Sequence, residues 1–317
     1  MITEEVLVSA LRGEWNGIRS IPKTDLHAHM LLSVPFDSYR KAFGKEVNRP
    51  PERFSSLSEF LQYLRSELIP NFSSVEIQRT LFRDCLQHMI SDGIVYTELA
   101  FDYMMAVSAK TSWEELIKAF TPEIEAVKDK IKVRCDFGLA RELTFPNLRE
   151  SIVSALGTGF FTGIDLYGEE TSREVNEFGY FFDEARKRGI KIKIHSGETG
   201  DPERVLRELR FVKPDGIQHG IRASEAAEAL EYLVRLGIPA NVCPFSNYQL
   251  SCIDDYNKHP IRKMYDVGVK VTLNTDDFGV FGRSLSEEYV RLFEAKVLTA
   301  DQLEVIRQNG LRMSQGR

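Results

Sequence analysis

The chain has 317 residues, of which 43% are apolar and 28% are charged. This composition is typical of a globular protein with a sizeable buried core, and it argues against disordered, collagen-like and coiled-coil classes. The formal net charge of −6 argues against nucleic-acid binding, which usually requires a basic stripe. The densest basic cluster, Arg186-Lys187-Arg188 before Gly189, is interpreted as the last turn of a helix.

The cysteines and the termini indicate a cytoplasmic protein. The four cysteines, Cys85, Cys135, Cys243 and Cys252, are too sparse for a disulfide scaffold and lack the close pairing of a zinc ribbon. They are interpreted as reduced thiols. The first five residues are acidic where a signal peptide is basic. No apolar run approaches the roughly 20 residues that span a bilayer, so we expect no membrane partner.

Short β-rich runs recur along the chain, and a helical pattern follows each of them. They are predicted at Lys23–His29, Ile94–Phe101, Val133–Ala140, Gly163–Tyr167, Ile190–His195, Gly216–His219, Pro239–Val242 and Val269–Asn274. Such a series of βα units over about 300 residues is typical of an α/β fold, the (β/α)₈ barrel. We expect one barrel domain over residues 1–317. A doubly wound open sheet is the alternative, but it would normally have fewer strands or a second domain.

Helical patterns complete the predicted barrel. One helix is predicted over Ser172–Arg188, ending at Gly189. The interval between the first two strands is about twice the length of one βα unit. It contains a helical pattern at Ser58–Leu68, so we expect a helical lid inserted after the first strand. Two more helices are predicted, around Glu287–Lys296 and over Thr299–Asn309, and the second opens with a capping-box pattern.

The first predicted strand ends in Asp25-Leu26-His27-Ala28-His29. Residues i and i+2 of a strand point to the same side, so His27 and His29 are expected to face the barrel lumen together. A single buried histidine is more often a hydrogen-bonded core residue than a ligand. Two neutral imidazoles on one face each need a partner, and a shared metal ion satisfies both. The pair alone leaves the structural and the metal-binding interpretations open.

Three other predicted strands also end in polar groups. His195 ends the fifth, His219 ends the sixth, and Asp276-Asp277 follows the eighth. Barrel enzymes place their catalytic groups at this C-terminal mouth. The Asp-Asp pair by itself is an ordinary cap or turn, but histidines and a carboxylate converging on one mouth form a donor set suited to Zn²⁺. The remaining histidines, His88 and His259, are interpreted as structural, although His259 could contact the surroundings of the site.

Several segments resemble motifs of the adenosine deaminase family of metal-dependent hydrolase barrels. The first is Lys23-Thr24-Asp25-Leu26-His27-Ala28-His29, which resembles the opening motif of the family. The others, in chain order, are Gly163-Ile164-Asp165-Leu166-Tyr167-Gly168-Glu169-Glu170, His195-Ser196-Gly197-Glu198, Gln218-His219-Gly220, Cys243-Pro244-Phe245-Ser246-Asn247 and Leu273-Asn274-Thr275-Asp276-Asp277. The resemblance extends from Lys23 to the C-terminal helices.

The resemblance implies a hydrolytic deaminase of a small-molecule aminopurine. Its one Zn²⁺ per chain would be held by His27, His29, His195 and Asp276, with Asp276 also counted among the catalytic residues. His219 would orient the attacking water and take its proton. Glu198 would donate a proton to purine N1, which requires a carboxyl group kept protonated by burial. The products would be a 6-oxopurine and ammonia.

The resemblance also implies the substrate contacts, and the chain departs from the family pattern at one of them. Asp277 would meet purine N7, the Gly168 N–H would meet N3, and His29 would border the substrate. After this histidine the family has an acid, which meets the ribose 5′-hydroxyl in adenosine deaminases, and then a glycine. Here these positions are Leu31 and Leu32.

An apolar residue at this position favours an apolar substituent over a hydroxyl group. We therefore expect a 5′-modified adenosine such as methylthioadenosine, or a differently substituted aminopurine, to be a better substrate than adenosine. A nucleotide is disfavoured because no Arg/Lys cluster for a phosphate lies near the motifs.

Two other classes of function stay open. One is a different hydrolase of the same barrel superfamily, acting on a pteridine, an amide or another aminopurine, including binuclear enzymes. The other is a non-catalytic barrel that binds a purine. The choice among Zn²⁺, Fe²⁺ and Mn²⁺, and the oligomeric state, are also open, because nitrogen and oxygen ligands discriminate poorly among these metals.

Overall fold

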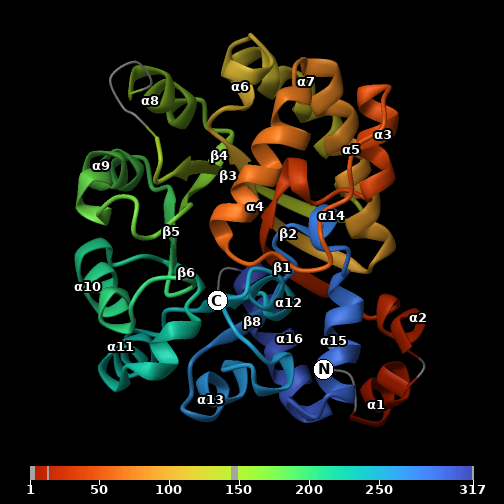
Figure 1. Cartoon of the computed structure of the whole chain (residues 1–317), viewed down its shortest axis with the longest axis vertical. Helices are drawn as coiled ribbons and strands as arrows, with labels where there is room; N and C mark the ends of the chain where they lie inside the picture. The colour runs from red at the N-terminus through yellow and green to blue at the C-terminus, as the bar shows by residue number, and fades with distance from the viewer. Residues whose placement is uncertain (1–3, 13, 144–148, 316–317) are drawn as a thin grey trace.

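The computed structural model describes residues 4–12, 14–143 and 149–315. Its centre is a sheet of eight parallel strands in the order β1 to β8, and Figure 1 shows helices surrounding these strands. The strands are β1 (Lys23–His29), β2 (Ile94–Asp102), β3 (Lys132–Ala140), β4 (Phe161–Tyr167), β5 (Lys191–Ser196), β6 (Gly216–His219), β7 (Ala240–Val242) and β8 (Val271–Leu273). The predicted (β/α)₈ barrel is confirmed, and each predicted strand agrees to within two residues at its ends.

The α-helices follow the strands around the barrel. They are α1 (Glu4–Arg12), α2 (Glu14–Arg19), α3 (Phe36–Phe43), α4 (Leu57–Tyr63), α5 (Val75–Ser91), α6 (Met105–Ser108), α7 (Trp113–Glu125), α8 (Arg149–Gly157), α9 (Gly179–Lys187), α10 (Pro202–Val212), α11 (Ala227–Leu236), α12 (Pro244–Gln249), α13 (Ile261–Asp266), α14 (Phe278–Phe281), α15 (Leu285–Glu294) and α16 (Ala300–Ser314). Within the described ranges no helix is long and apolar enough to cross a membrane.

Two predicted helices show how local sequence determines helix ends. The capping box predicted before α16 is present, with Thr299 and Gln302 bonded reciprocally. The helix predicted over Ser172–Arg188 is wrong in its first half, where a 3₁₀ helix, η4 (Val175–Phe178), precedes α9. Gly179 stands at the junction, and glycine has a low helix propensity that favours such a break.

The sheet closes at the seam between β8 and β1. Ala28 and Asp276 form an isolated parallel bridge. The backbone N–H of Asp276 donates to His27 O at 2.9 Å, and the His29 N–H donates to Asp276 O at 3.4 Å. The chain segment after β8 therefore joins the barrel where β1 ends, which excludes the open-sheet alternative.

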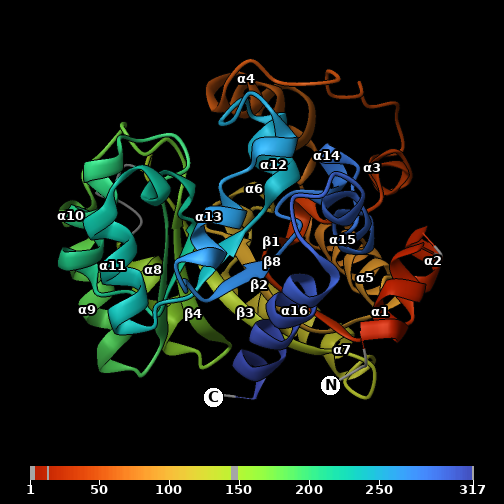
Figure 2. The same ribbon diagram turned by 90° about the horizontal axis from the view of Figure 1, so that it is seen from below.

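The long connection between β1 and β2 folds over the C-terminal mouth. It contains η1 (Met30–Leu32), α3, α4, a π-helical turn η2 (Leu64–Leu68), η3 (Ile69–Asn71) and α5. Ser56 caps α4 by accepting from the Glu59 N–H. In Figure 2, α4 and α12 lie at one end of the molecule and α16 lies toward the other. Residues of α4 and η2 line the cavity that also contains the strand-end histidines.

A chain of hydrogen bonds crosses the barrel interior beneath the mouth. Gln218 donates to Asp165 at 3.1 Å, Asn241 donates to Gln218 at 2.8 Å, and Thr272 donates to Asn241 at 2.8 Å. Asn274 then donates to the Thr272 hydroxyl at 3.0 Å. These side chains are all buried. Because an unpaired buried polar group is costly, the chain holds β4, β6, β7 and β8 in one arrangement.

A buried lysine lies on the other side of the barrel interior. Lys193 of β5 pairs with Asp136 of β3, lies 3.2 Å from Glu98 of β2, and donates to Leu26 O of β1 at 3.1 Å. Burial raises the pKa of Asp136 to about 6. The ammonium group therefore holds two buried carboxylates together, and these would repel each other without it.

Replacing this lysine is expected to destabilise the barrel strongly. Lys193→Met leaves Asp136 and Glu98 buried without their cation, which should lower the free energy of unfolding by about 3 kcal/mol. Urea denaturation at neutral pH measures the loss. The control is Lys118→Met on the exposed side of α7, expected to change stability by less than about 0.5 kcal/mol. Equal stabilities of the two variants would contradict the prediction.

Candidate metal centre and active site

Two histidine rings meet at the centre of the mouth with their lone pairs facing each other. His27 Nδ1 lies 3.2 Å from Asn241 O, and His195 Nδ1 lies 3.2 Å from Asp165 Oδ1. Both partners are acceptors, so each Nδ1 carries the ring hydrogen and each Nε2 carries a lone pair. The two Nε2 atoms lie 3.0 Å apart. Burial lowers the pKa of His27 to about 3, so a proton is a poor mediator between them. A metal cation is what this arrangement requires.

Asp276 and His29 complete the donor set. Asp276 Oδ1 lies 3.4 Å from both His27 Nε2 and His29 Nε2. One donor atom from each of His27, His29, His195 and Asp276 lies within 4.8 Å of the others. The second carboxylate oxygen, Oδ2, accepts from the Ser246 hydroxyl at 2.6 Å, which orients the carboxylate. Three imidazoles and a carboxylate fit Zn²⁺ in number and in chemistry.

The backbone is bent at His219 and at Asp276, where their side chains enter the mouth. His219 has φ of +58° and Asp276 has φ of +63°. This left-handed region is uncommon for residues other than glycine, and such strain is concentrated at functional sites. His219 is the last residue of the buried strand β6, and Asp276 follows the buried strand β8 by three residues.

Glu198 lies beside the donor set. Its Oε2 is 3.4 Å from His219 Nε2, and its Oε1 accepts from Asn247 Nδ2 at 3.3 Å. Burial raises the pKa of Glu198 well above its ordinary value, and the nearby carboxylate of Asp276 adds to the shift. Such a shift favours the protonated carboxyl group, which can act as an acid.

Glu170 holds the loop that carries Glu198. Its two carboxylate oxygens accept hydrogen bonds from the backbone N–H groups of Gly197, Glu198, Thr199 and Gly200 at 2.7 to 3.3 Å. Arg204 Nη1 donates to Glu170 O at 2.7 Å. The Glu198 backbone is thus fixed by a carboxylate that comes from the loop after β4, and the acid has little freedom to move.

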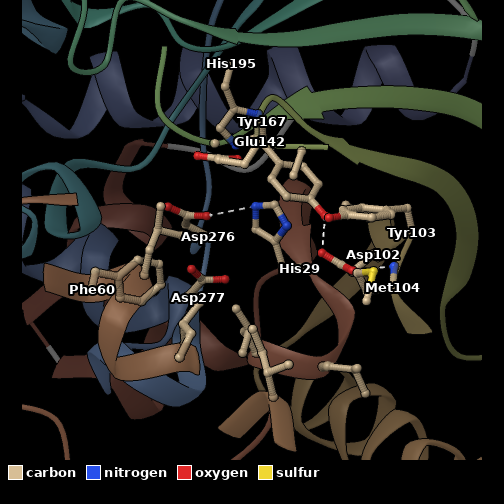
Figure 3. A pocket seen from close by; sticks show the side chains of 18 of the residues that line it. His29, Phe60, Asp102, Tyr103, Met104, Glu142, Tyr167, His195, Asp276 and Asp277 are labelled. Carbon is tan, nitrogen blue, oxygen red and sulfur yellow. Dashed lines mark hydrogen bonds and ion pairs between the residues drawn. The ribbon is translucent and has the colours of Figure 1, made fainter. Parts of the chain in front are cut away.

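A cavity opens from the donor set toward the connection between β1 and β2. Its walls are largely apolar, and the apolar residues include Leu31, Leu57, Phe60, Leu61, Leu64 and Met105. Figure 3 shows Phe60 and Asp277 on one side of the cavity and Tyr103, Met104 and Asp102 on the other. Leu31 itself is buried and has its backbone carbonyl bonded to Tyr39 Oη at 2.9 Å.

Polar groups interrupt these walls at a few places. The Tyr167 hydroxyl donates to Asp102, and the tyrosine ring lies edge-on to His29 at a centroid distance of 5.0 Å. Glu142 accepts from the Glu169 N–H at 2.8 Å. A Cβ on Gly168 would lie 2.3 Å from Glu142 Oε2, and Gly168 has φ of +97°. Only glycine therefore fits at residue 168.

Asp277 points into the cavity without a partner for one of its oxygens. Its Oδ1 is buried and has no hydrogen-bond partner among the described residues. Burial raises the pKa of Asp277 well above its ordinary value, and the adjacent Asp276 adds to the shift. An unpaired buried polar atom that faces a cavity is typical of a group that meets a ligand.

All the residues that the sequence singles out come together in this one place. His29, Leu31, Gly168, His195, Glu198, His219, Asp276 and Asp277 line the cavity, and His27 lies directly behind them. His259 contacts Asn247, which contacts Glu198 and His219, whereas His88 stacks on Phe278 at 3.7 Å.

Sequence reasoning missed Glu170 as the anchor of the Glu198 loop, and it missed Glu142, Tyr167 and Arg65 as cavity-lining residues. Glu170 stands inside one of the quoted motifs, so its position was a usable signal. Tyr167 stands inside the same motif and had the same signal, whereas Glu142 and Arg65 lie outside every quoted motif.

The barrel, with its donor set at the C-terminal mouth, defines a metal-dependent hydrolase of the amidohydrolase class. The chain belongs to the adenosine deaminase family, whose sequence model matches residues 22–316. It is therefore a hydrolytic deaminase of the adenosine/adenine type that acts on aminopurines.

Relatives and solved structures agree with this assignment. The chain is 30% identical over 287 residues to a putative adenosine/adenine deaminase of Treponema pallidum, covering 89% of this chain and 94% of the relative. It is 29% identical to an adenosine deaminase of Clostridium acetobutylicum, with 94% of each chain covered.

Two solved structures share the fold. One is an amidohydrolase of Burkholderia ambifaria with bound Zn, with a TM-score of 0.82, 21% identity, and 98% and 88% of the two chains covered. The other is an Arabidopsis ADAL complexed with IMP, with a TM-score of 0.79, 22% identity, and 94% and 95% covered.

Loosening the Glu198 loop is expected to reduce activity. Glu170→Gln replaces one acceptor oxygen with an NH₂ group that faces backbone N–H donors, so Glu198 should shift and kcat/KM for ammonia release should fall about 10²-fold. Steady-state kinetics measure this loss. The matched control is Glu177→Gln on the exposed η4, which should keep its activity. Unchanged kinetics for Glu170→Gln would show that the loop holds its shape without this carboxylate.

Proposed function

We propose that the chain is a zinc-dependent deaminase of a 6-aminopurine nucleoside or base, with one Zn²⁺ per chain held by His27, His29, His195 and Asp276. The observation that carries the proposal is the pair of opposed Nε2 lone pairs of His27 and His195, 3.0 Å apart, beside Glu198, whose pKa burial raises well above its ordinary value. A bound Zn²⁺ would supply Lewis-acid activation of a water molecule near neutral pH.

The side chains around the metal centre then have distinct roles. Glu198 donates its proton to purine N1 and makes the ring more electrophilic at C6. His219, with Nε2 3.4 Å from Glu198 Oε2 and 3.9 Å from Asp276 Oδ2, holds the attacking water in place. Ammonia leaves and the 6-oxopurine forms.

Two more groups bind the purine ring. Asp277 meets N7, which is an acceptor, so the carboxyl group must be protonated to donate to it. The raised pKa of Asp277 supports that state. The Gly168 N–H meets N3, and the absence of a Cβ lets the ring approach the backbone beside Glu142. His29 borders the substrate and is itself oriented by Tyr167.

The walls of the cavity support a substrate with an apolar 5′ substituent. Leu31 offers no hydrogen bond where a ribose 5′-hydroxyl would arrive, and Leu57, Phe60 and Leu61 of α4 continue the same apolar wall. A thioether gains from this contact, whereas a hydroxyl group would be buried without a partner. Among the described lining residues other than histidine, Arg65 is the one cation, and the acidic residues Asp102 and Glu142 line the same cavity. We therefore propose a 5′-methylthio nucleoside rather than a nucleotide.

The first test measures ammonia release by zinc-loaded protein on adenosine, adenine, 5′-deoxyadenosine and 5′-methylthioadenosine. Highest kcat/KM on the two nucleosides without a 5′-hydroxyl supports the whole proposal. A preference for adenosine or adenine keeps the deaminase and rejects the substrate. No hydrolysis of any aminopurine would favour a non-catalytic purine-binding barrel, and two metal ions per chain would favour a binuclear hydrolase.

The acid role of Glu198 predicts both a variant and a pH dependence. Glu198→Gln should lower kcat by about 10³-fold, since general acid catalysis contributes 10²- to 10⁴-fold. The acid works only when protonated, so the activity of the wild type should persist at neutral pH and fall as pH rises through the raised pKa of Glu198. Rate measurements from pH 5 to pH 10 test this. A wild-type rate that already falls steadily from pH 5 to pH 7, as expected for an acid with the ordinary glutamate pKa of about 4.3, would contradict it.

The substrate argument predicts the effect of restoring an acid at residue 31. Leu31→Asp should shift the ratio of kcat/KM values from methylthioadenosine toward adenosine by about 10²-fold, because the carboxylate bonds the 5′-hydroxyl and is left unpaired beside a thioether. Leu31→Met is the matched control and should keep the original preference. An unchanged ratio in Leu31→Asp would show that this side chain does not meet the 5′ group.

A further inference from the structure

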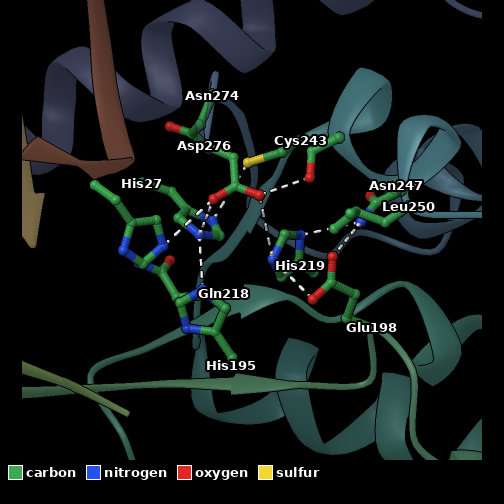
Figure 4. A network of polar contacts seen from close by, with 12 residues as sticks. His27, His195, Glu198, Gln218, His219, Cys243, Asn247, Leu250, Asn274 and Asp276 are labelled. Atoms are coloured by element: carbon green, nitrogen blue, oxygen red, sulfur yellow. Dashed lines mark hydrogen bonds and ion pairs between the residues drawn. The ribbon is translucent and has the colours of Figure 1, made fainter. Parts of the chain in front are cut away.

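A run of hydrogen bonds reaches the active site from the chain segment between α12 and α13. It begins at the Ile261 N–H, which donates to His259 Nδ1 at 3.0 Å. His259 Nε2 then lies 3.2 Å from Asn247 Oδ1. Asn247 Nδ2 lies 3.1 Å from His219 Nδ1 and 3.3 Å from Glu198 Oε1. Figure 4 shows Asn247 next to both of these residues.

The direction of each bond follows from the first. A backbone N–H can only donate, so His259 Nδ1 accepts and the ring hydrogen of the neutral imidazole sits on Nε2. His259 is buried and its pKa is lowered to about 3 by that burial, so the ring is neutral. Its Nε2–H therefore donates to Asn247, and the atom of the amide that receives it must be the carbonyl oxygen.

With the carbonyl oriented toward His259, the NH₂ group of Asn247 faces the site. It carries two hydrogens and has two neighbours there, His219 Nδ1 and Glu198 Oε1. Each neighbour must accept. A neutral His219 that accepts at Nδ1 carries its hydrogen on Nε2, and a protonated Glu198 that accepts at Oε1 carries its hydrogen on Oε2.

We infer that Asn247, oriented by His259, determines which ring nitrogen of His219 and which carboxyl oxygen of Glu198 carry a proton. Asn247 and His259 are thus positioning residues of the active site. The inference rests on the proposed function, in which Glu198 is the acid and His219 holds the attacking water.

The consequence is that both protons face the reacting groups. His219 Nε2 lies 3.4 Å from Glu198 Oε2 and 3.9 Å from Asp276 Oδ2. In this tautomer, His219 offers an N–H to an oxygen in the site and has no free lone pair with which to accept a proton there. The histidine therefore orients and stabilises the attacking oxygen as a donor, which revises the proton-accepting role that the family resemblance implies. Glu198, ionised once its own proton is on purine N1, then takes one proton of the water, and the other goes to the leaving amine as ammonia forms.

The other His219 tautomer, with its hydrogen on Nδ1, is disfavoured by an unmatched pair of hydrogen-bond donors, whether or not substrate is bound. A hydrogen on His219 Nδ1 would point at the NH₂ group of Asn247. Rotating the amide to relieve that contact would place NH₂ against the Nε2–H of His259, whose own tautomer is set by the backbone at Ile261. An unmatched pair of buried donors costs about 1–3 kcal/mol.

The experiment observes the tautomer directly. Protein labelled with ¹⁵N in its six histidines and loaded with zinc is examined by NMR, and the His219 signals are assigned by their loss in His219→Gln. The wild type should show His219 protonated on Nε2. Asn247→Asp replaces the donor with an acceptor of the same shape, so the proton should move to Nδ1. Asn309→Asp, whose asparagine bonds Val271 O on the far side of β8, is the matched control and should leave the His219 signals unchanged.

Kinetics provide the second readout. A fixed wrong tautomer should lower kcat of Asn247→Asp by about 10²- to 10⁴-fold, with KM changed less than threefold. His259→Phe, the second variant if Asn247→Asp does not fold, removes the donor that orients the amide and should give a mixture of both His219 tautomers.

The outcomes separate the inference from the proposed function. A wild-type His219 protonated on Nδ1, or an Nε2 proton that stays in both Asn247→Asp and His259→Phe, overturns the inference. A tautomer that moves as expected in a protein that deaminates no purine supports the inference and rejects the proposed function. If the His219 tautomer moves and kcat does not fall, the hydrogen bonds through Asn247 do not matter for catalysis. That result overturns the assignment of Asn247 and His259 as positioning residues.

Discussion

Two unprotonated imidazole nitrogens brought to 3.0 Å in a buried site constrain much of the structure around them. Such an arrangement is stable only if each ring is prevented from rotating and if a cation can enter between them. Asn241 O and Asp165 prevent rotation at the two Nδ1 atoms, and both belong to the hydrogen-bonded chain that crosses the barrel interior. The polar barrel interior is thus an extension of the metal centre, and its order is the reason that the ligands are correctly oriented before any metal binds.

A second constraint is electrostatic, because several carboxyl groups are crowded into one buried mouth. Repulsion among them is reduced because they do not all carry a negative charge. Asp276 faces the histidines and is ionised, while Glu198 and Asp277, which lie near the same negative charge, have raised pKa values. In the proposed function, carboxyl side chains would therefore supply both a metal ligand, Asp276, and two hydrogen-bond donors, Glu198 and Asp277, and the difference comes from position alone.

The barrel and the donor set could be predicted because both depend on local signals. Strand periodicity located β1 to β8, and a parallel barrel necessarily brings strand ends such as His195 and His219 to one mouth. Contacts between side chains from distant elements could not be predicted in this way. The Tyr167–Asp102 bond joins β4 and β2, and the direction of the Asn247 amide depends on His259 in a later loop. The break between η4 and α9 was missed because a helical pattern does not show whether a single glycine within it, here Gly179, will interrupt the helix.

The seam of the barrel has a consequence beyond closure. Asp276 is at once the bridge partner of Ala28 and a member of the donor set, so the last strand is joined to the first at the position where a cation would be held. Metal affinity and closure of the β-barrel are therefore thermodynamically linked. Any substitution that weakens the pairing of β8 with β1, however far from the cavity, should appear as a weaker metal affinity, and a chelator should loosen the two ends of the sheet before it affects the rest of the chain.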